Sequence, residues 1–222
     1  MRGPALAGPT RETIVPLREI PGPTGRLEAL LDEPPESPSD LRAAVVFAHP
    51  HPQYGGTMHT KVVYQSAKAL SRIGCAVLRF NFRGVGASEG SFDEGVGERQ
   101  DFRAGLAFMS DRYPGARLWA AGFSFGSWIA LTAGADDHRV STLIGIAPPV
   151  AGYDFAPVRT STKPKFLIHG ERDELCPLRD LQQFYAHLPE PKELVVIDGA
   201  DHLFDGKTSE VGDALEDLLG DW

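Results

Sequence analysis

Residues 118–131, LWAAGFSFGSWIAL, decide the fold of this 222-residue chain. The apolar run LWAA is typical of a short buried strand, and the residues that follow 122–126 are typical of a helix. Between them, GFSFG at 122–126 fits Gly-x-Ser-x-Gly, the pattern of a sharp strand-to-helix turn with the serine at its tip. Glycine at both ends lets the strand and the helix approach closely, and Ser124 then lies at a helix N-terminus. A strand followed at once by a helix is the repeating unit of an α/β fold.

The segments on both sides continue this alternation. AAVVFA at 43–48, for example, is apolar throughout, as expected of a strand buried on both faces. The first two strands are joined by a predicted turn, PGPTG at 21–25. We predict strands at residues 13–17, 26–31, 43–48, 76–80, 118–121, 140–146, 166–169 and 193–197, and helices at about 58–72, 95–111, 125–133, 178–187 and 210–219. This order predicts a three-layer α/β fold, a mostly parallel, twisted sheet of about eight strands flanked by helices.

Length and charge limit the classes of protein to consider. Residues 1–10, rich in Pro and Gly, are expected to form a flexible N-terminus, and residues 11–222 a single domain. With 22 Lys and Arg against 30 Asp and Glu, the net charge is -8. Because no basic stripe is present either, nucleic acid is not an expected partner.

The two cysteines, Cys75 and Cys176, lie far apart without Cys-x-x-Cys spacing. This favours neither a disulfide framework nor a zinc cluster. No apolar run at the N-terminus reaches the length of a signal peptide, and the longest runs elsewhere are only long enough for strands. We therefore expect a soluble, cytoplasmic protein without a membrane partner.

A second Gly-x-Ser-x-Gly sequence, GASEG at 86–90, competes with the one around Ser124. Ser124 directly follows a predicted strand and opens a helix, whereas Ser88 lies in a long Gly-rich loop several residues past its strand. This context favours Ser124 as a nucleophile and Ser88 as a turn residue. The motif alone is also compatible with a tight turn without chemistry, so the partners of the serine must decide.

A nucleophilic serine needs an imidazole to take its proton and a carboxylate to orient that imidazole. Asp173 follows the predicted strand KFLIH, and His202 follows the strand LVVID, so both lie on loops at the carboxyl edge of the sheet with Ser124. The chain order serine, aspartate, histidine is that of one of the common serine hydrolase folds. Fallback candidates for the acid are Asp198, Glu171 and Asp205. Of the competing histidines, His138 and His187 fall at or beside predicted helices, and His169 is interpreted as a structural residue that ends a strand.

The anion formed by serine attack needs two backbone N–H donors. One is expected from Phe125, the residue after the serine, and the other from the loop HPHPQYGG at 49–56, where we favour the backbone of His51 because the prolines have no N–H. The imidazoles of His49, His51 and His59 could instead bind a metal. The prolines break regular spacing and no carboxylate or cysteine accompanies these rings, so we predict no metal and no other cofactor.

The ordered segments 48–61, 79–95, 122–126, 169–177 and 199–204 together resemble the α/β-hydrolase superfamily. More narrowly, residues 40–220 resemble the small bacterial serine esterases related to dienelactone hydrolases and serine aminopeptidases. Dienelactone hydrolases proper carry a cysteine where this chain has Ser124, which argues against that activity. The aminopeptidase relatives insert a large cap after the sixth strand, and residues 148–164 are too few for one. The resemblance implies an uncapped site and the roles assigned above to Ser124, Asp173, His202, His51 and Phe125.

We therefore expect a carboxylesterase-like serine hydrolase that acts on a small-molecule ester. A thioesterase, lactonase or peptidase would use the same groups, and a non-catalytic binding protein on this scaffold is the alternative from another class. The resemblance also implies a structural role for Arg83 and Gly84, as a loop clamp beneath the cleft. An exposed edge strand or terminal helix is compatible with a homodimer. Five side chains are candidates to line the acyl or alcohol pocket: Tyr54, Met58, Tyr153, Phe155 and Leu203.

Overall fold

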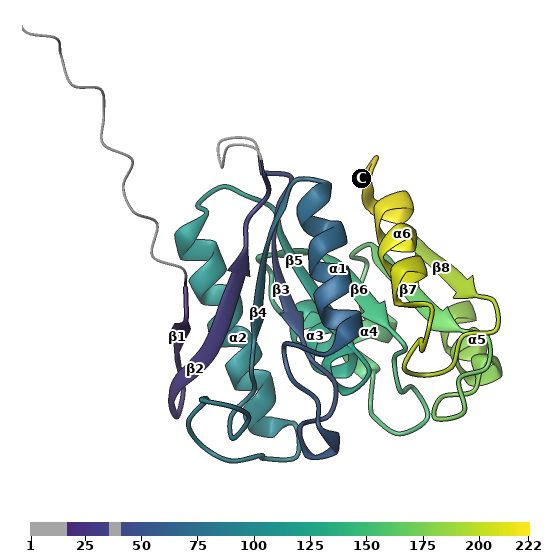
Figure 1. Cartoon of the computed structure of the whole chain (residues 1–222). Coiled ribbons are helices and arrows are strands. Elements are labelled where there is room, and N and C mark those ends of the chain that lie inside the picture. The colour runs from purple at the N-terminus through teal and green to yellow at the C-terminus, as the bar shows by residue number, and fades with distance from the viewer. Residues whose placement is uncertain (1–16, 36–40) are drawn as a thin grey trace, which may run out of the picture.

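The computed structural model describes residues 17–35 and 41–222. Its strands are β1 Glu19–Gly22, β2 Gly25–Asp32, β3 Ala43–Ala48, β4 Cys75–Phe80, β5 Leu118–Phe123, β6 Val140–Ile146, β7 Lys165–Gly170 and β8 Lys192–Ile197. These described strands form one eight-stranded sheet in the order β1-β2-β4-β3-β5-β6-β7-β8 (Figure 1). β2 pairs antiparallel with both of its neighbours, whereas all other pairs are parallel.

β3 illustrates how the apolar pattern builds the centre of the sheet. All of its residues are buried. Ala44 and Val46 belong to the hydrophobic cluster on one face, and Val45 and Phe47 to the cluster on the other, because successive side chains of a strand point to opposite faces. A central strand covered on both faces is therefore apolar at every position.

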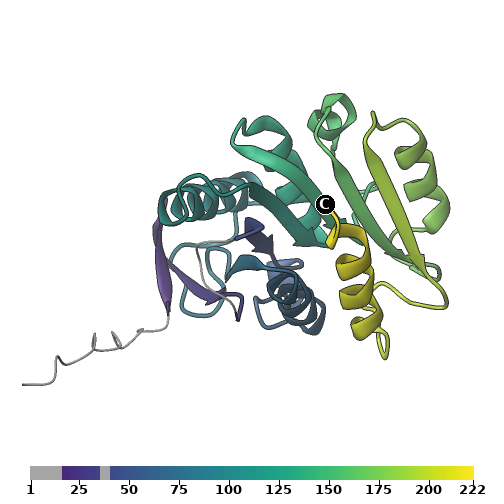
Figure 2. The same cartoon turned by 90° about the horizontal axis from the view of Figure 1, so that it is seen from above.

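Helices cover both faces of the sheet. They are α1 Lys61–Arg72, α2 Val96–Arg112, α3 Phe125–Asp136, α4 Ala156–Thr160, α5 Leu178–Ala186 and α6 Thr208–Leu219. α1 and α6 lie side by side on one face, and the other four pack on the opposite face (Figure 2). The predicted three-layer arrangement is confirmed.

The structure differs from the prediction at the start of the sheet. The flexible terminus predicted at 1–10 and most of the strand predicted at 13–17 lie outside the described residues. β1 overlaps the predicted turn at 21–25, and only Pro23 and Thr24 form the turn between β1 and β2. Pro21 is tolerated in β1 because an edge strand leaves one side of its backbone unpaired.

Two helical segments also differ. The helix predicted from about residue 58 begins at Lys61, because Met58 is tied to the region of β4: its N–H donates to Asn81 Oδ1 and its carbonyl accepts from Arg79 Nη1, both at 2.8 Å. Residues 148–164 form no cap and contain the five-residue α4. No helix within 17–35 and 41–222 is long and apolar enough to cross a membrane.

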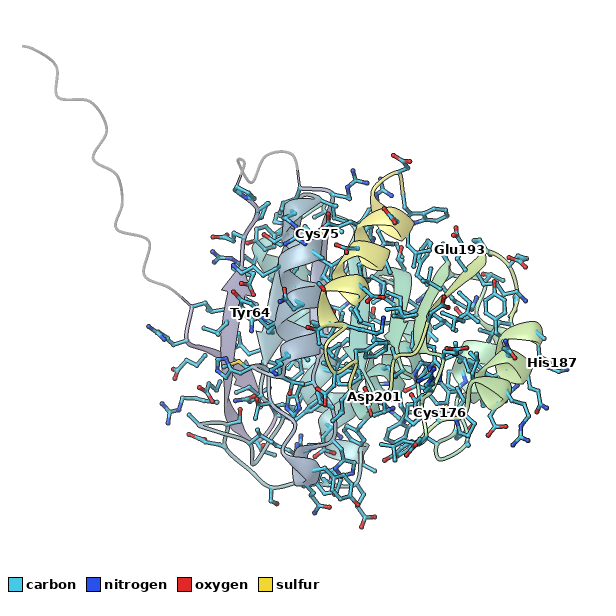
Figure 3. All side chains as sticks on the ribbon, turned by 45° about the vertical axis from the view of Figure 1, so that its right-hand side comes forward. Tyr64, Cys75, Cys176, His187, Glu193 and Asp201 are labelled. Atoms are coloured by element: carbon cyan, nitrogen blue, oxygen red, sulfur yellow. The ribbon has the colours of Figure 1, made fainter. Side chains whose placement is uncertain are left out.

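The loops that follow β3, β5, β7 and β8 leave the sheet at the same edge, because these strands run parallel. Figure 3 shows Cys176 and Asp201, from the loops after β7 and β8, at this end of the molecule. Cys75, the first residue of β4, lies at the opposite end. The residues singled out from the sequence therefore gather at one edge.

Candidate active site

Ser124 lies between β5 and α3 in a conformation that few residues other than glycine adopt. Its φ is 54° and its ψ -123°, and its N–H donates to the carbonyl of Ile146 at the end of β6 (2.8 Å). A Cβ at Gly122 would collide with the carbonyl of Gly126, and a Cβ at Gly126 with the carbonyl of Ala48. Both glycines are therefore needed for a turn that holds the hydroxyl at the sheet edge.

The side chains of Asp173, His202 and Ser124 form a continuous chain of hydrogen bonds. His202 Nδ1 lies 2.7 Å from Asp173 Oδ2. Because a carboxylate only accepts, Nδ1 carries the ring proton. The other ring nitrogen, Nε2, lies 2.8 Å from Ser124 Oγ and can accept the hydroxyl proton. Three side chains predicted separately thus come together in the geometry in which an imidazole can activate a serine.

The carboxylate of Asp173 is buried and fully hydrogen bonded. Its Oδ1 accepts from the N–H groups of Leu175 (2.9 Å) and Cys176 (2.8 Å). Burial acts to raise the pKa of Asp173, but the hydrogen bonds from His202 and from the Cys176 amide outweigh it, and the pKa lies below its ordinary value. The side chain is therefore an anion at neutral pH. Glu171, one of the fallback candidates, accepts from the Gly199 N–H instead (2.7 Å).

His169 supports this acid, a role that the sequence did not reveal. The buried ring donates from Nε2 to the carbonyl of Cys176 (2.8 Å) and lies 3.6 Å from Asp173 Oδ2. Burial holds the pKa of His169 below its ordinary value, so the ring is neutral near pH 7. The ring fixes the loop whose amides bind Asp173. The only local signal was its place at the end of β7, four residues before the acid.

The loop after β3 places a second set of groups beside the serine. Phe125 opens α3, and the ring of His51 packs against it with centroids 4.8 Å apart. In the part of the chain that the structure describes, neither backbone N–H donates a hydrogen bond, so both are free for a ligand. Gly56 keeps the loop tight, because a Cβ there would collide with the carbonyl of Pro50. The two residues predicted as anion donors are thus neighbours in space.

His49 holds this loop to the sheet. Its buried ring donates from Nδ1 to the Pro50 carbonyl (2.6 Å), and Nε2 accepts from the N–H of Phe82 (3.0 Å). Burial lowers the pKa of His49 to about 4, so the ring is neutral and its tautomer is fixed. Within the described residues, no three His, Cys, Asp or Glu side chains are grouped so that they could hold a metal ion.

Ser88, from the competing motif, is a structural residue. Its hydroxyl donates to the carbonyl of Asn81 (2.6 Å) and accepts from the N–H of Glu28 (2.9 Å), which ties its loop to β2. A hydroxyl engaged on both sides is not available as a nucleophile. Arg83 is likewise structural, as expected, because its Nη2 donates to the buried carboxylate of Asp101 (2.7 Å).

The five candidate substrate residues differ in exposure. Tyr54 and Leu203 are 86% and 54% exposed, and Tyr153 is half-buried. Met58 and Phe155 are only 1% and 2% exposed. Met58 is held beneath the surface by its backbone bonds near β4, and Phe155 packs against α5. These two side chains belong to the interior and not to the wall of an open site, contrary to the expectation from the sequence.

The fold and the placement of these residues define an α/β hydrolase. The sheet is mostly parallel, a serine stands on the strand-to-helix turn after β5, and an aspartate and a histidine follow β7 and β8. Residues 39–158 match the family described as serine aminopeptidase, S33. The chain belongs to this family of hydrolases.

Similar proteins agree with this assignment. Uncharacterized protein RP471 of Rickettsia prowazekii is 38% identical over 207 residues, which cover 89% of this chain and 86% of that protein. An α/β serine hydrolase homologue from Coxiella burnetii superposes with a TM-score of 0.87 at 37% identity, over 95% of this chain and all (100%) of that one. XC6422 from Xanthomonas campestris, a serine hydrolase without a lid, superposes with a TM-score of 0.86 at 34% identity, over 97% of this chain and 98% of that one. The predicted uncapped α/β-hydrolase fold is confirmed.

Proposed function

We propose that this hydrolase is a serine esterase that cleaves small carboxylic esters through an acyl-enzyme intermediate. Ser124 is the nucleophile, His202 the general base and acid, and Asp173 the carboxylate that orients His202. The observation that carries the proposal is the chain of hydrogen bonds from Asp173 through His202 to Ser124. A serine hydroxyl is a weak nucleophile at neutral pH unless a base of this kind activates it.

In the proposed reaction, Ser124 Oγ attacks the ester carbonyl carbon while His202 Nε2 takes the hydroxyl proton. Asp173 stabilises the imidazolium, and the N–H groups of His51 and Phe125 stabilise the oxyanion. When the tetrahedral intermediate collapses, the bond to the leaving oxygen breaks and His202 protonates the alcohol. A water molecule, deprotonated by His202, then cleaves the acyl-enzyme, which releases the acid and restores Ser124.

The preference for small or accessible esters is inferred from the open edge of the sheet. Only the short α4 lies between β6 and β7, so no inserted domain covers the serine. Peptide hydrolysis is the second candidate, because the matched family is described as serine aminopeptidase. The same groups would also act on a thioester or a lactone.

The nucleophile is tested by labelling with a fluorophosphonate, located by peptide mass spectrometry. We expect the label on Ser124 in the wild type and in Ser88→Ala, and no label in Ser124→Ala. Because Ser88 donates and accepts hydrogen bonds within the protein, it should not react. A wild type that is not labelled would refute the proposal and favour a binding protein on a hydrolase scaffold.

The bond that is cleaved is tested by comparing kcat/KM for an ester, a thioester and an amide with the same acyl group. We expect the ester to be the best substrate. Efficient amide cleavage with negligible ester turnover would replace the esterase by a peptidase. Asp173→Asn should lower kcat for the ester by about 10⁴-fold, because an amide at this position favours the wrong tautomer of His202.

A further inference from the structure

Aromatic rings form a continuous cluster beside the proposed oxyanion donors. The ring of His51 contacts Tyr54 (centroids 4.7 Å apart), Phe92 (5.0 Å) and Phe125 (4.8 Å). The ring centroids of Phe125 and Tyr153 are in turn 5.9 Å apart. Tyr153 also stacks on Trp128, which packs against Phe125. We call these six residues the aromatic arc: His51, Tyr54, Phe92, Phe125, Trp128 and Tyr153.

The arc has a buried base and an open side. Phe125 and Trp128 are 2% and 8% exposed, and the indole Nε1 of Trp128 donates to the Asp154 carbonyl (2.8 Å), which fixes its ring. Tyr153 is half-buried, and Tyr54 is largely exposed. The rings of Tyr54 and Tyr153 are linked through two others, because Tyr54 packs on His51, His51 on Phe125 and Phe125 on Tyr153. The arc therefore presents tyrosine rings to solvent on a fixed aromatic support.

The reaction geometry assigns this surface to one half of an ester. His202 must protonate the leaving oxygen, so the alcohol half lies toward His202 and its exposed neighbour Leu203. The carbonyl oxygen points to the N–H groups of His51 and Phe125, whose own rings belong to the arc. The acyl half, directed away from the leaving group, then lies along the aromatic arc.

We propose that the protein prefers esters of aromatic carboxylic acids, and that Tyr54 and Tyr153 bind the ring of the acyl group. This inference rests on the proposed esterase function and names the substrate class of the same site. Aromatic pairs in offset or edge-to-face contact are stabilised beyond the burial of their area, so an arc of rings distinguishes an aromatic ring from a saturated ring of the same size.

The test uses two 4-nitrophenyl esters with the same leaving group, the 3-phenylpropanoate and the 3-cyclohexylpropanoate. We expect the wild type to favour the phenyl ester by about tenfold in kcat/KM, the gain of roughly one well-formed aromatic pair. Tyr153→Leu and Tyr54→Leu should each reduce this ratio several-fold. Because Tyr54 is 86% exposed, its replacement should not disturb folding.

Tyr64→Leu is the matched control. Tyr64 lies on α1 (Figure 3), is 44% exposed and is not one of the six residues of the arc, so the ratio and the activity should equal those of the wild type. A ratio near one in the wild type, or a ratio that both arc variants retain, would overturn the proposal. Turnover of 4-nitrophenyl acetate and labelling of Ser124 show separately whether the esterase proposal stands.

A second series distinguishes the two halves of the ester. Phenethyl acetate and 2-cyclohexylethyl acetate differ only in the ring of the alcohol. We expect similar kcat/KM values for this pair. An aromatic preference confined to the alcohol series would place the arc on the leaving-group side and overturn the assignment to the acyl group.

Discussion

Replacing Asp101 by asparagine should lower the free energy of unfolding by about 3–5 kcal/mol, the cost of removing one partner of a buried ion pair. The side chain of Asp101 is completely buried (0% exposed) and that of Arg83 nearly so (6%). Asp101 accepts from Arg83 Nη2 (2.7 Å), from Nε (3.0 Å) and from the Arg83 backbone N–H (3.0 Å). An asparagine would keep one accepting oxygen but turn an N–H₂ group toward the remaining donors, and it would remove the buried negative charge that faces the guanidinium.

The matched control is Asp93, a second carboxylate near the Arg83 guanidinium. Arg83 Nη1 also lies 3.9 Å from Asp93, whose side chain is 58% exposed. Exposed pairs contribute about 0–1 kcal/mol, so Asp93→Asn should cost no more than this although the chemical change is identical. Urea denaturation, followed by fluorescence, gives both values from the transition midpoint and its slope. A difference of less than about 1 kcal/mol between the two variants would refute the reasoning that burial decides the strength of this pair.

Ser88→Ala should destabilise the protein by about 1–3 kcal/mol, because the buried bond to the Asn81 carbonyl is lost and the part-buried Glu28 N–H loses its acceptor. Fluorophosphonate should still label Ser124 at the wild-type rate; slower labelling would implicate Ser88 in the chemistry. Gly126→Ala should abolish labelling, since its Cβ collides with the end of β3, whereas Gly152→Ala, whose Cβ would meet nothing closer than 3.8 Å, should react normally. The pKa of His49 is about 4 in the folded protein and about 6.5 when unfolded. Because the unfolded chain then binds more protons below pH 6.5, His49 alone should lower the free energy of unfolding by about 3 kcal/mol between pH 7 and pH 4. Denaturation of His49→Gln should therefore show a smaller fall over this range than the wild type, and an equal fall would contradict the assignment.

The fold was predictable because each of its signals lies within one short segment. The continuous apolar run of β3 requires cover on both faces, and this is where the structure places it. The glycines of 122–126 have a steric reason, because a Cβ at Gly122 or Gly126 would collide with a backbone carbonyl. Asp173 and His202 could be selected because each follows a strand of the predicted sheet. In the structure His202 contacts Ser124 and Asp173 contacts His202, while their catalytic roles stay predictions.

Contacts between distant segments were beyond the reach of the sequence. Ser88 bonds to β2 across 60 positions of the chain, and no local pattern distinguishes it from a mobile turn residue. The burial of Met58 depends on a bond to Asn81, 23 positions away. Pro21 and its glycine neighbours indicated a turn, but pairing with β2 extends β1 into them. In each case tertiary pairing overrode the local composition.

The backbone conformation at Ser124 fixes where the reactive atom lies but does not depend on that atom being oxygen. The φ of 54° depends on the missing side chains at 122 and 126 and on the bond to Ile146, not on the hydroxyl itself. A thiol in its place would meet the same imidazole without any change in the surrounding chain. One scaffold can therefore exchange oxygen for sulfur chemistry in a single substitution, and in evolution the kind of nucleophile can change more readily than the turn that carries it.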